Sequence, residues 1–473
     1  MEGLTQDQVQ GLKSVEASPV AIKRLTTALR TLRPPARPTK QALAADSRKA
    51  QTIYQAGGEL LRTWPPKSKR DARQARAAET VTGALRTVRN AFARVYAPLI
   101  YDTITNGYRR LVRVEELVHE VALLCPGLCP TRTEVEAELQ CAQAAKDGVE
   151  IPQGDFLSHA FAHKRSGDHL LHAMLRPLPQ SLDLLEQFRR DGRLDLGTAQ
   201  AERRGAAGYV LFNNLRYLNA EDDGTLIPLE TAVDLVLLDP ALQVGVVRGN
   251  PMNRGKYQGR RAFSAGLNLT RLYAGKIPLM FFFTRELGFV NKIHRGLTGD
   301  VYDSDGPETT LEKPWLAALE AFAIGGGCQL LLVMDYVIAE AGSYFSLPAR
   351  KEGIIPGLAN LRLPRFLGER MAQQGILFDR QFPADAPEAR LLLNEVVPVG
   401  EMDAAIERVV GGAMGAGQIS ARANRKAIRV AAEPRETLRQ YMALYCREQG
   451  DCLYSPALID NLERHWDARN RRL

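Results

Sequence analysis

The stretch Leu319-Glu320-Ala321-Phe322-Ala323-Ile324-Gly325-Gly326-Gly327-Cys328-Gln329-Leu330 places three glycines between a strand pattern of small residues and an apolar helix pattern. Glycine lets the backbone approach a ligand because it has no Cβ, and the first N–H groups of a helix form a positive pole. A junction of this kind directs backbone N–H groups at an oxygen. The stretch therefore predicts an α/β fold with an oxyanion-binding turn.

A second junction lies upstream, where a short extended run bends through glycine toward a helix. It is the segment Arg260-Arg261-Ala262-Phe263-Ser264-Ala265-Gly266-Leu267-Asn268-Leu269. Two backbone N–H donors that converge on one thioester oxygen would form an oxyanion hole, which usually contributes the largest single term in acyl or enolate chemistry. The pair of junctions predicts a site that stabilises an enolate or a tetrahedral intermediate.

Together the two junctions resemble the signature segments of the crotonase (enoyl-CoA hydratase) superfamily. The resemblance begins at Tyr209-Val210-Leu211-Phe212-Asn213, includes Phe345-Ser346-Leu347-Pro348 and Ile355-Pro356-Gly357, and fades near Val409. It implies a spiral of ββα units, an acyl-CoA substrate and a homo-oligomer, either a trimer or a hexamer. It also implies that the two donors are the N–H groups of Leu267 and Gly326.

Two acidic residues that hydratases of this superfamily carry are absent. Gln329 and Ala349 stand where those enzymes have glutamates. Neither glutamine nor alanine can exchange a proton near neutral pH, so general acid/base hydration of a double bond has lost both carboxylates. The oxyanion hole is retained without the usual means of activating water.

Within the superfamily the chain resembles a cofactor-independent dioxygenase branch. That resemblance implies conversion of (3,5-dihydroxyphenyl)acetyl-CoA and O2 to 3,5-dihydroxyphenylglyoxylate and free CoA, with no metal, flavin or other cofactor. It is carried by the long segment Leu272–Glu312, which contains Arg285-Glu286-Leu287-Gly288, and by Leu218-Asn219-Ala220-Glu221-Asp222. The site residues that it implies are Glu221, Arg285 and Gln329 for the substrate, and Ala220, Arg254, Lys256, Arg260 and Arg261 for CoA.

Other interpretations of these residues stay open. Glu221 could lie in an exposed turn, Arg285 could pair with Glu286 or with an acid on another helix, and Gln329 could be an ordinary hydrogen-bonded helix residue. The group that takes the Cα proton is undetermined, since neither motif nor spacing favours His294 or Glu286. Another crotonase reaction (thioester hydrolysis, decarboxylation or isomerisation) and a non-catalytic CoA-binding or scaffold protein also remain possible.

The length of 473 residues, 45% of them apolar, predicts more than one domain. Residues 1–200 have apolar positions at three- and four-residue spacing and are expected to form a helical domain. Residues 201–417 alternate short strands with helices and form the expected core. Residues 418–473 are expected to be helical, with helices at 421–447 and 455–471.

Several classes of protein are disfavoured by composition. The chain has no apolar run of the roughly 18 residues that a membrane span needs, and its start lacks a signal pattern, so a cytoplasmic location is expected. Six cysteines without a CxxC pair indicate reduced thiols. The net charge of +8 comes from basic residues at helical spacing with few aromatics, which is typical of solvated helix faces rather than of nucleic-acid binding.

Four of the seven histidines, His159, His163, His169 and His172, lie close together in the helical part. An iron site would need a carboxylate such as Asp155 or Asp168 beside two of them. Apolar neighbours, and a helix break expected at 165–168, favour core or capping histidines instead, and a lid over the active site is the remaining alternative. No metal site is predicted.

Overall fold

The computed structural model describes residues 3–304, 306, 309–414 and 417–471. The chain forms two compact units. The first extends to Leu170 and includes Tyr273–Met280 and Met442–Pro456, and the second contains Leu171–Leu272, Phe281–Tyr441 and the chain from Ala457 onward. The sequence predicts continuous domains with boundaries at 200 and 417, whereas each of these units combines separate segments of the chain. The predicted domain boundaries therefore stay a prediction.

The first unit is built from helices. They are α1 (Gln6–Lys13), α2 (Pro19–Leu29), α3 (Lys40–Arg62), α4 (Ala72–Ile104), α5 (Val114–Leu124), α6 (Arg132–Glu138) and α7 (Ile151–Ala162), with 3₁₀ turns at Lys67–Lys69 and Gln143–Ala145. Side chains of Thr39, Asp71 and Thr131 accept hydrogen bonds from the first turns of α3, α4 and α6, which satisfies N–H groups that have no intrahelical acceptor. The proline pairs at 34–35 and 65–66 lie between helices, as predicted.

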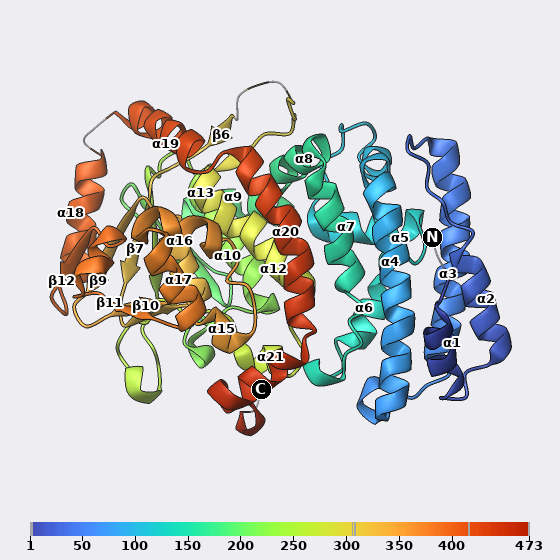
Figure 1. Ribbon diagram of the computed structural model, residues 1–473. Helices are drawn as coiled ribbons and strands as arrows, with labels where there is room; N and C mark the ends of the chain where they lie inside the picture. Colours follow the sequence, from blue (N-terminus) through green and yellow to red (C-terminus); the bar gives the residue numbers. More distant parts are fainter. Residues whose placement is uncertain (1–2, 305, 307–308, 415–416, 472–473) are drawn as a thin grey trace. The chain divides into compact units, whose positions relative to one another are not determined.

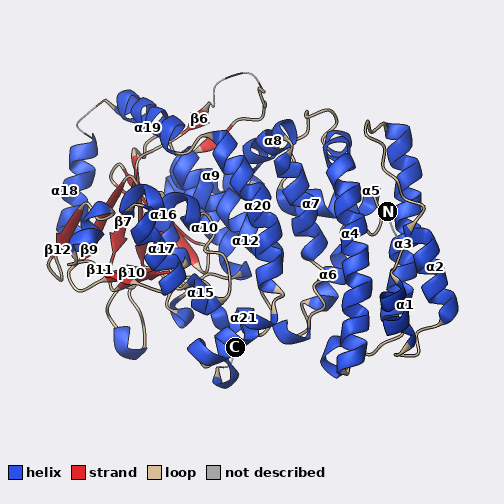
Figure 2. Cartoon of the chain, in the orientation of Figure 1, coloured by secondary structure: helices blue, strands red, loops and turns tan. Residues whose placement is uncertain are grey.

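The described part of the second unit contains a sheet of seven strands (Figure 2). In spatial order the strands are β1 (Arg193–Asp195), β2 (Ala199–Arg204), β3 (Ala207–Phe212), β4 (Val244–Gly249), β7 (Trp315–Leu319), β9 (Tyr336–Glu340) and β12 (Glu395–Val397). From β3 onward neighbouring strands are parallel. One face packs against α18 (Met402–Met414) through a core that includes Val246, Leu316 and Ile406 (Figure 1).

A smaller sheet has three strands. In spatial order they are β11 (Gln381–Pro383), β10 (Tyr344–Ser346) and β8 (Phe322–Ile324). Each turn of the chain gives one strand to each sheet and then a helix, as in β7, β8 and α14 (Gly326–Leu331) or β9, β10 and α15 (Ala349–Glu352). This order confirms the ββα repeat predicted from the sequence. The two-stranded pair β5 (Leu297–Thr298) and β6 (Thr310–Leu311) completes the strands of the described chain.

The remaining helices complete the described chain, and several of them run from one unit into the other. They are α8 (Lys164–Met174), α9 (Pro179–Asp191), α10 (Asp223–Leu238), α11 (Leu269–Tyr273), α12 (Leu279–Arg285), a π-helical turn (Glu286–Val290), α13 (Asn291–Arg295), α16 (Ala359–Leu367), α17 (Glu369–Phe378), α19 (Gln418–Ala432), α20 (Arg435–Leu453) and α21 (Pro456–Trp466). Short 3₁₀ turns occur at Leu215–Tyr217, Gly255–Tyr257, Pro387–Leu391 and Ala468–Asn470.

Two helix predictions were wrong. The single helix expected at 421–447 is divided into α19 and α20, because Pro434 has no N–H and restricts the residue before it. Residues 165–168 do not break a helix either, since they lie inside α8 and the interruption falls at His163.

Candidate active site

The upstream oxyanion junction, residues 260–269, is an extended segment held between two neighbours. It forms isolated parallel bridges to Ala323 through Ser264 and to Glu221 through Leu267. The bridge to Glu221 uses the Glu221 N–H to the Gly266 oxygen (2.6 Å) and the Asn268 N–H to the Glu221 oxygen (2.8 Å). In a parallel bridge the central residue directs its own N–H to the opposite side of the strand. The Leu267 N–H therefore points away from Glu221, and among the described residues no backbone oxygen accepts it.

The glycine-rich junction, residues 319–330, brings a helix start to the same place. Gly325 has φ +51°, a conformation that favours glycine, and it precedes α14, whose first residue is Gly326. The Gly326 N–H belongs to the first turn, where no intrahelical acceptor exists. A Cβ placed on Gly266 would lie 3.0 Å from the Gly326 nitrogen. The two predicted donor turns are thus in direct contact.

Arg285 is the centre of a buried polar network beside these turns. Its Nε and Nη2 donate to the two Glu221 carboxylate oxygens at 2.6 and 2.9 Å. Its Nη1 donates to Glu286 Oε1 at 2.6 Å and to Gln329 Oε1 at 2.7 Å, and Nη2 also donates to the Gly326 carbonyl at 2.8 Å. A guanidinium has five N–H groups. All five are used within the protein, so Arg285 holds its neighbours in position.

The charges around Arg285 explain why a neutral residue, Gln329, completes the network. Burial would lower the pKa of Arg285, but the carboxylates of Glu221 and Glu286 raise it, so the guanidinium stays charged. Two carboxylates then share one positive charge. Because an Arg285 N–H must face an oxygen, the Gln329 amide is oriented with Oε1 toward Arg285 and its NH2 group away from it. A neutral amide at this position avoids placing a third carboxylate on one arginine.

The alternatives left open by the sequence are therefore decided for two residues. Glu221 is not in an exposed turn, since only 1% of it is exposed. Arg285 pairs with Glu286 and with a second acid, as one alternative proposed. Sequence analysis did not predict that both pairings occur together, because Glu221 and Arg285 are 64 positions apart.

Ala349 begins α15 and is buried, with 2% exposed. Nothing at this position can ionise, in line with the loss of the hydratase carboxylates. His294 is surrounded by a buried ion cluster around Glu433, with its Nε2 3.6 Å from Glu433 Oε2. Burial lowers the pKa of His294 well below its usual value.

The residues predicted to bind CoA have different partners in the structure. Arg254 Nη2 donates to the Arg216 carbonyl (2.8 Å), and Arg260 Nη2 donates to Glu340 Oε2 (3.3 Å). Lys256 is exposed and lies 4.9 Å from the centre of the Tyr257 ring. Ala220 is buried next to Glu221.

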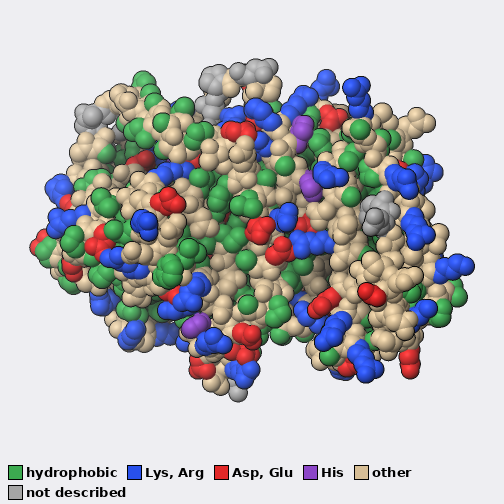
Figure 3. Space-filling model, viewed as in Figure 1, with side chains coloured by type: hydrophobic (Ala, Val, Ile, Leu, Met, Phe, Trp, Pro, Cys, Tyr) green, Lys and Arg blue, Asp and Glu red, His purple; other side chains and the backbone are tan. Residues whose placement is uncertain are grey.

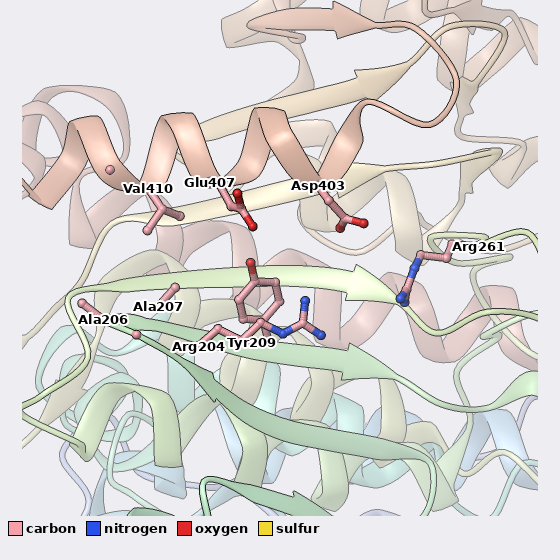
Figure 4. Close-up of a pocket in the computed structure, with 10 residues that line it drawn as sticks. Arg204, Ala206, Ala207, Tyr209, Arg261, Asp403, Glu407 and Val410 are labelled. Carbon is pink, nitrogen blue, oxygen red and sulfur yellow. The ribbon is translucent and has the colours of Figure 1, made fainter.

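Arg261 lines a pocket of about 550 Å³ on the sheet face that α18 covers (Figure 4). In this view Arg261, Tyr209 and Arg204 come from the strand side, and Asp403 and Glu407 project from the helix. The Arg261 Nη1 donates to the Gly249 carbonyl at 2.8 Å. Two carboxylates face the two arginines, so the lining does not present positive charge alone.

The histidines of the helical part each have a different partner. His159 contacts Asn90 Oδ1 (3.1 Å), His163 contacts Ser166 Oγ (3.1 Å) and His169 contacts the Tyr101 hydroxyl (2.7 Å). Among the described residues no three His, Cys, Asp or Glu side chains gather as metal ligands would. The interpretation as core and capping histidines fits these contacts.

On the face shown in Figure 3, basic side chains are scattered among acidic and apolar ones. No helix within the described ranges combines the length and the apolar composition that a bilayer span requires.

Comparison with known proteins places this site in a family. The profile of the enoyl-CoA hydratase/isomerase family matches residues 294–449. The chain is 44% identical to the (3,5-dihydroxyphenyl)acetyl-CoA 1,2-dioxygenase of Amycolatopsis orientalis over 415 residues, which cover 88% of this chain and 94% of that protein. It is 28% identical to the crotonyl-CoA hydratase of Syntrophomonas wolfei over 48% of this chain and 79% of that one.

The solved structure of the enoyl-CoA hydratase of Bacillus halodurans is 18% identical in sequence and superposes with a TM-score of 0.47. The superposition covers 57% of this chain and 100% of that one. The identity across nearly the full length of the Amycolatopsis enzyme decides the assignment. The chain belongs to the enoyl-CoA hydratase/isomerase family.

Proposed function

We propose that this protein is an arylacetyl-CoA dioxygenase that converts (3,5-dihydroxyphenyl)acetyl-CoA and O2 to 3,5-dihydroxyphenylglyoxylate and free CoA. The observation that carries the proposal is the contact between the two oxyanion turns, next to a network in which Gln329 replaces the hydratase acid. The 44% identity to the Amycolatopsis dioxygenase supports the same reaction.

The chemistry begins with the thioester carbonyl between the N–H groups of Leu267 and Gly326. Loss of a Cα proton gives an enolate whose charge the two donors stabilise, and preorganised donors of this kind act strongly where water is excluded. The enolate transfers an electron to O2 and combines with it to give a peroxide at Cα. Attack of the peroxide on the thioester carbonyl forms a C–O bond and expels CoA as its thiolate. Loss of the remaining Cα proton then places the C–H electron pair in the new C=O bond, the O–O bond breaks, and the arylglyoxylate is left with its carboxylate.

The sequence predicts Glu221, Arg285 and Gln329 as the residues that contact the ring. Because the Arg285 donors are used within the protein, we propose Glu286 in its place as a contact. The Gln329 NH2 group and the carboxylates of Glu221 and Glu286 offer a donor and acceptors to ring hydroxyls. Arg285, whose donors are all used, orients these groups. For CoA we keep Ala220, Arg254, Lys256, Arg260 and Arg261 as proposed contacts, because a polyanionic tail gains from charge-assisted contacts even when they are spread along its length.

Oxygen consumption and CoA release test the proposal together. The purified protein, treated exhaustively with chelator, should consume one O2 for each CoA released from (3,5-dihydroxyphenyl)acetyl-CoA. CoA release without oxygen uptake would instead indicate a thioester hydrolase. Failure to release CoA from this and related arylacetyl thioesters would indicate a binding protein. Recovery of activity only on addition of iron or flavin would contradict the cofactor-independent reaction.

We also propose that the protein is a cytoplasmic homo-oligomer, a trimer or hexamer as the resemblance implies, with no nucleic-acid partner. Light scattering coupled to size exclusion would give the mass directly, and a monomer across a range of concentrations would contradict this.

A further inference from the structure

A third buried glutamate, in addition to Glu221 and Glu286, lies close to the oxyanion turn. Glu352 is the last residue of α15, three positions after Ala349. Residues three apart lie on the same face of a helix. Ala349 stands where hydratases keep a glutamate, so this chain presents a carboxyl group from the same helical face one turn later.

The carboxyl group of Glu352 touches the loop that carries a proposed donor. A Cβ placed on Gly325 would lie 3.6 Å from Glu352 Oε1 and 3.9 Å from Oε2. Gly325 directly precedes Gly326. Glu352 is 8% exposed, so it is shielded from bulk water at this place.

The other buried acids near the site are paired with arginine, and Glu352 is not. Within the described part of the chain, Glu221 and Glu286 each pair with Arg285, whereas the influences on the Glu352 carboxyl group are its burial and the negative charge of Asp379. A buried carboxylate without a partner is costly in free energy. Such a group beside a turn that carries a proposed donor is a candidate for function.

One acidic neighbour, Asp379, acts on the carboxyl group of Glu352 through its negative charge. Asp379, which follows α17, pairs with Arg350 and lies 3.9 Å from Lys351 Nζ. The facing helix α21 contributes uncharged groups, Leu458 and Asn461, at Gly353. Burial, and then the charge of Asp379, raise the pKa of Glu352 to about 8. A general base works best when its pKa lies near the working pH.

We propose that Glu352 is the general base that removes the Cα proton of the bound thioester. This inference rests on the proposed function. The Cα–H bond breaks and an O–H bond forms on Glu352. The electron pair moves into the enolate, whose oxygen lies between the N–H groups of Leu267 and Gly326. Protonation also removes the buried charge of Glu352, which favours the transfer.

Exchange of the Cα protons under anaerobic conditions isolates this step from the reaction with oxygen. The arylacetyl-CoA would be incubated in D2O without O2, and deuterium incorporation would be followed by mass spectrometry. The Glu352→Gln variant keeps the shape of the side chain but cannot accept the proton. Its exchange rate should fall by about 10²–10⁴-fold, and its affinity for a non-reactive thioether analogue should not change. Exchange at the wild-type rate would overturn the proposal.

A pH profile separates a base from a structural residue. Wild-type exchange should rise with pH and level off above about pH 8. The Asp379→Asn variant should reach the same plateau with its midpoint at lower pH, because one negative neighbour is lost. Asparagine tolerates the positive φ of +59° at this position. An unchanged midpoint in Asp379→Asn together with a normal profile in Glu352→Gln would refute the role.

Failure of the two proposals can be told apart. If the wild type neither exchanges deuterium nor consumes oxygen, the proposed function is wrong, and the role of Glu352 falls with it. If the wild type does both and Glu352→Gln exchanges equally well, only the role of Glu352 is wrong.

Discussion

The substitution Gln329→Glu restores the residue type that hydratases carry, and the network around Arg285 predicts what it would do. A Cβ on Gly357 would lie 2.3 Å from Glu286 Oε1 and 2.7 Å from Gln329 Oε1, so these two oxygens are close neighbours. A new carboxylate would be attracted by Arg285 and repelled by Glu286. At about 5 Å and an effective dielectric constant of about 20, one such interaction is worth about 3 kcal/mol.

Those two interactions largely cancel, which leaves repulsion by Glu221 and the cost of burial. Together they come to about 3–5 kcal/mol, which would raise the pKa of the new carboxyl by about 2–4 units. The variant should therefore be neutral below about pH 6 and ionised in alkaline solution. When ionised, it would repel an enolate at about 5 Å by about 3 kcal/mol, a loss of about 10²-fold in rate.

The assay is oxygen uptake from pH 5.5 to 9.5, expressed as the ratio of the variant rate to the wild-type rate at each pH. That ratio should fall as the pH rises through the new pKa. Gln329→Ala, which lacks any ionisable group, should give a ratio that does not depend on pH. A ratio for Gln329→Glu that is constant, or that rises with pH, would refute the placement of Gln329 beside the enolate.

Three further changes have defined outcomes. Gly326→Pro removes the N–H donor at a first helical position, where proline is tolerated. Its turnover should be about 10²-fold or more below that of Gly326→Ala, which keeps the N–H and also places a new Cβ 2.8 Å from Glu221 Oε1. Equal turnover of the two variants would place the oxyanion elsewhere. Glu433→Gln should lower the free energy of unfolding by about 3–5 kcal/mol, measured with urea, because buried Arg362 and Arg295 lose their carboxylate; a change below about 1 kcal/mol would contradict this. Glu352→Gln should gain stability relative to wild type as the pH rises toward about 8, since a folded-state pKa raised above the unfolded value destabilises the fold over that window; thermal unfolding at pH 5 and pH 8 would show no difference if Glu352 were ordinarily solvated.

The oxyanion turns could be predicted because their signals are local. Glycine at Gly266 and Gly325 marks positive φ, and each glycine is followed by a helix within a few residues. The alternation of short strands and helices was likewise predictable, and the family resemblance implied that it forms ββα units. In both cases neighbouring residues carry the information that determines the backbone.

The polar network could not be predicted in full, because its members come from distant segments. Glu221, Arg285 and Gln329 are separated by 64 and 44 positions, and only tertiary packing brings them together. The same holds for Glu433, whose partners lie on α13 and α16. The break before α20 had a local signal in Pro434. The apolar positions at helical spacing on both sides of this proline nevertheless led to the prediction of one continuous helix.

The most direct test of the account is the reaction under ¹⁸O2 with metal-free protein and (3,5-dihydroxyphenyl)acetyl-CoA. Attack of the Cα peroxide on the thioester carbonyl leaves one oxygen atom of O2 on the keto carbon and the other on the carboxylate. The account predicts an arylglyoxylate that carries both labelled atoms, formed in equal amount with free CoA. A product with one labelled atom, or CoA released with an unlabelled arylacetate, would contradict it.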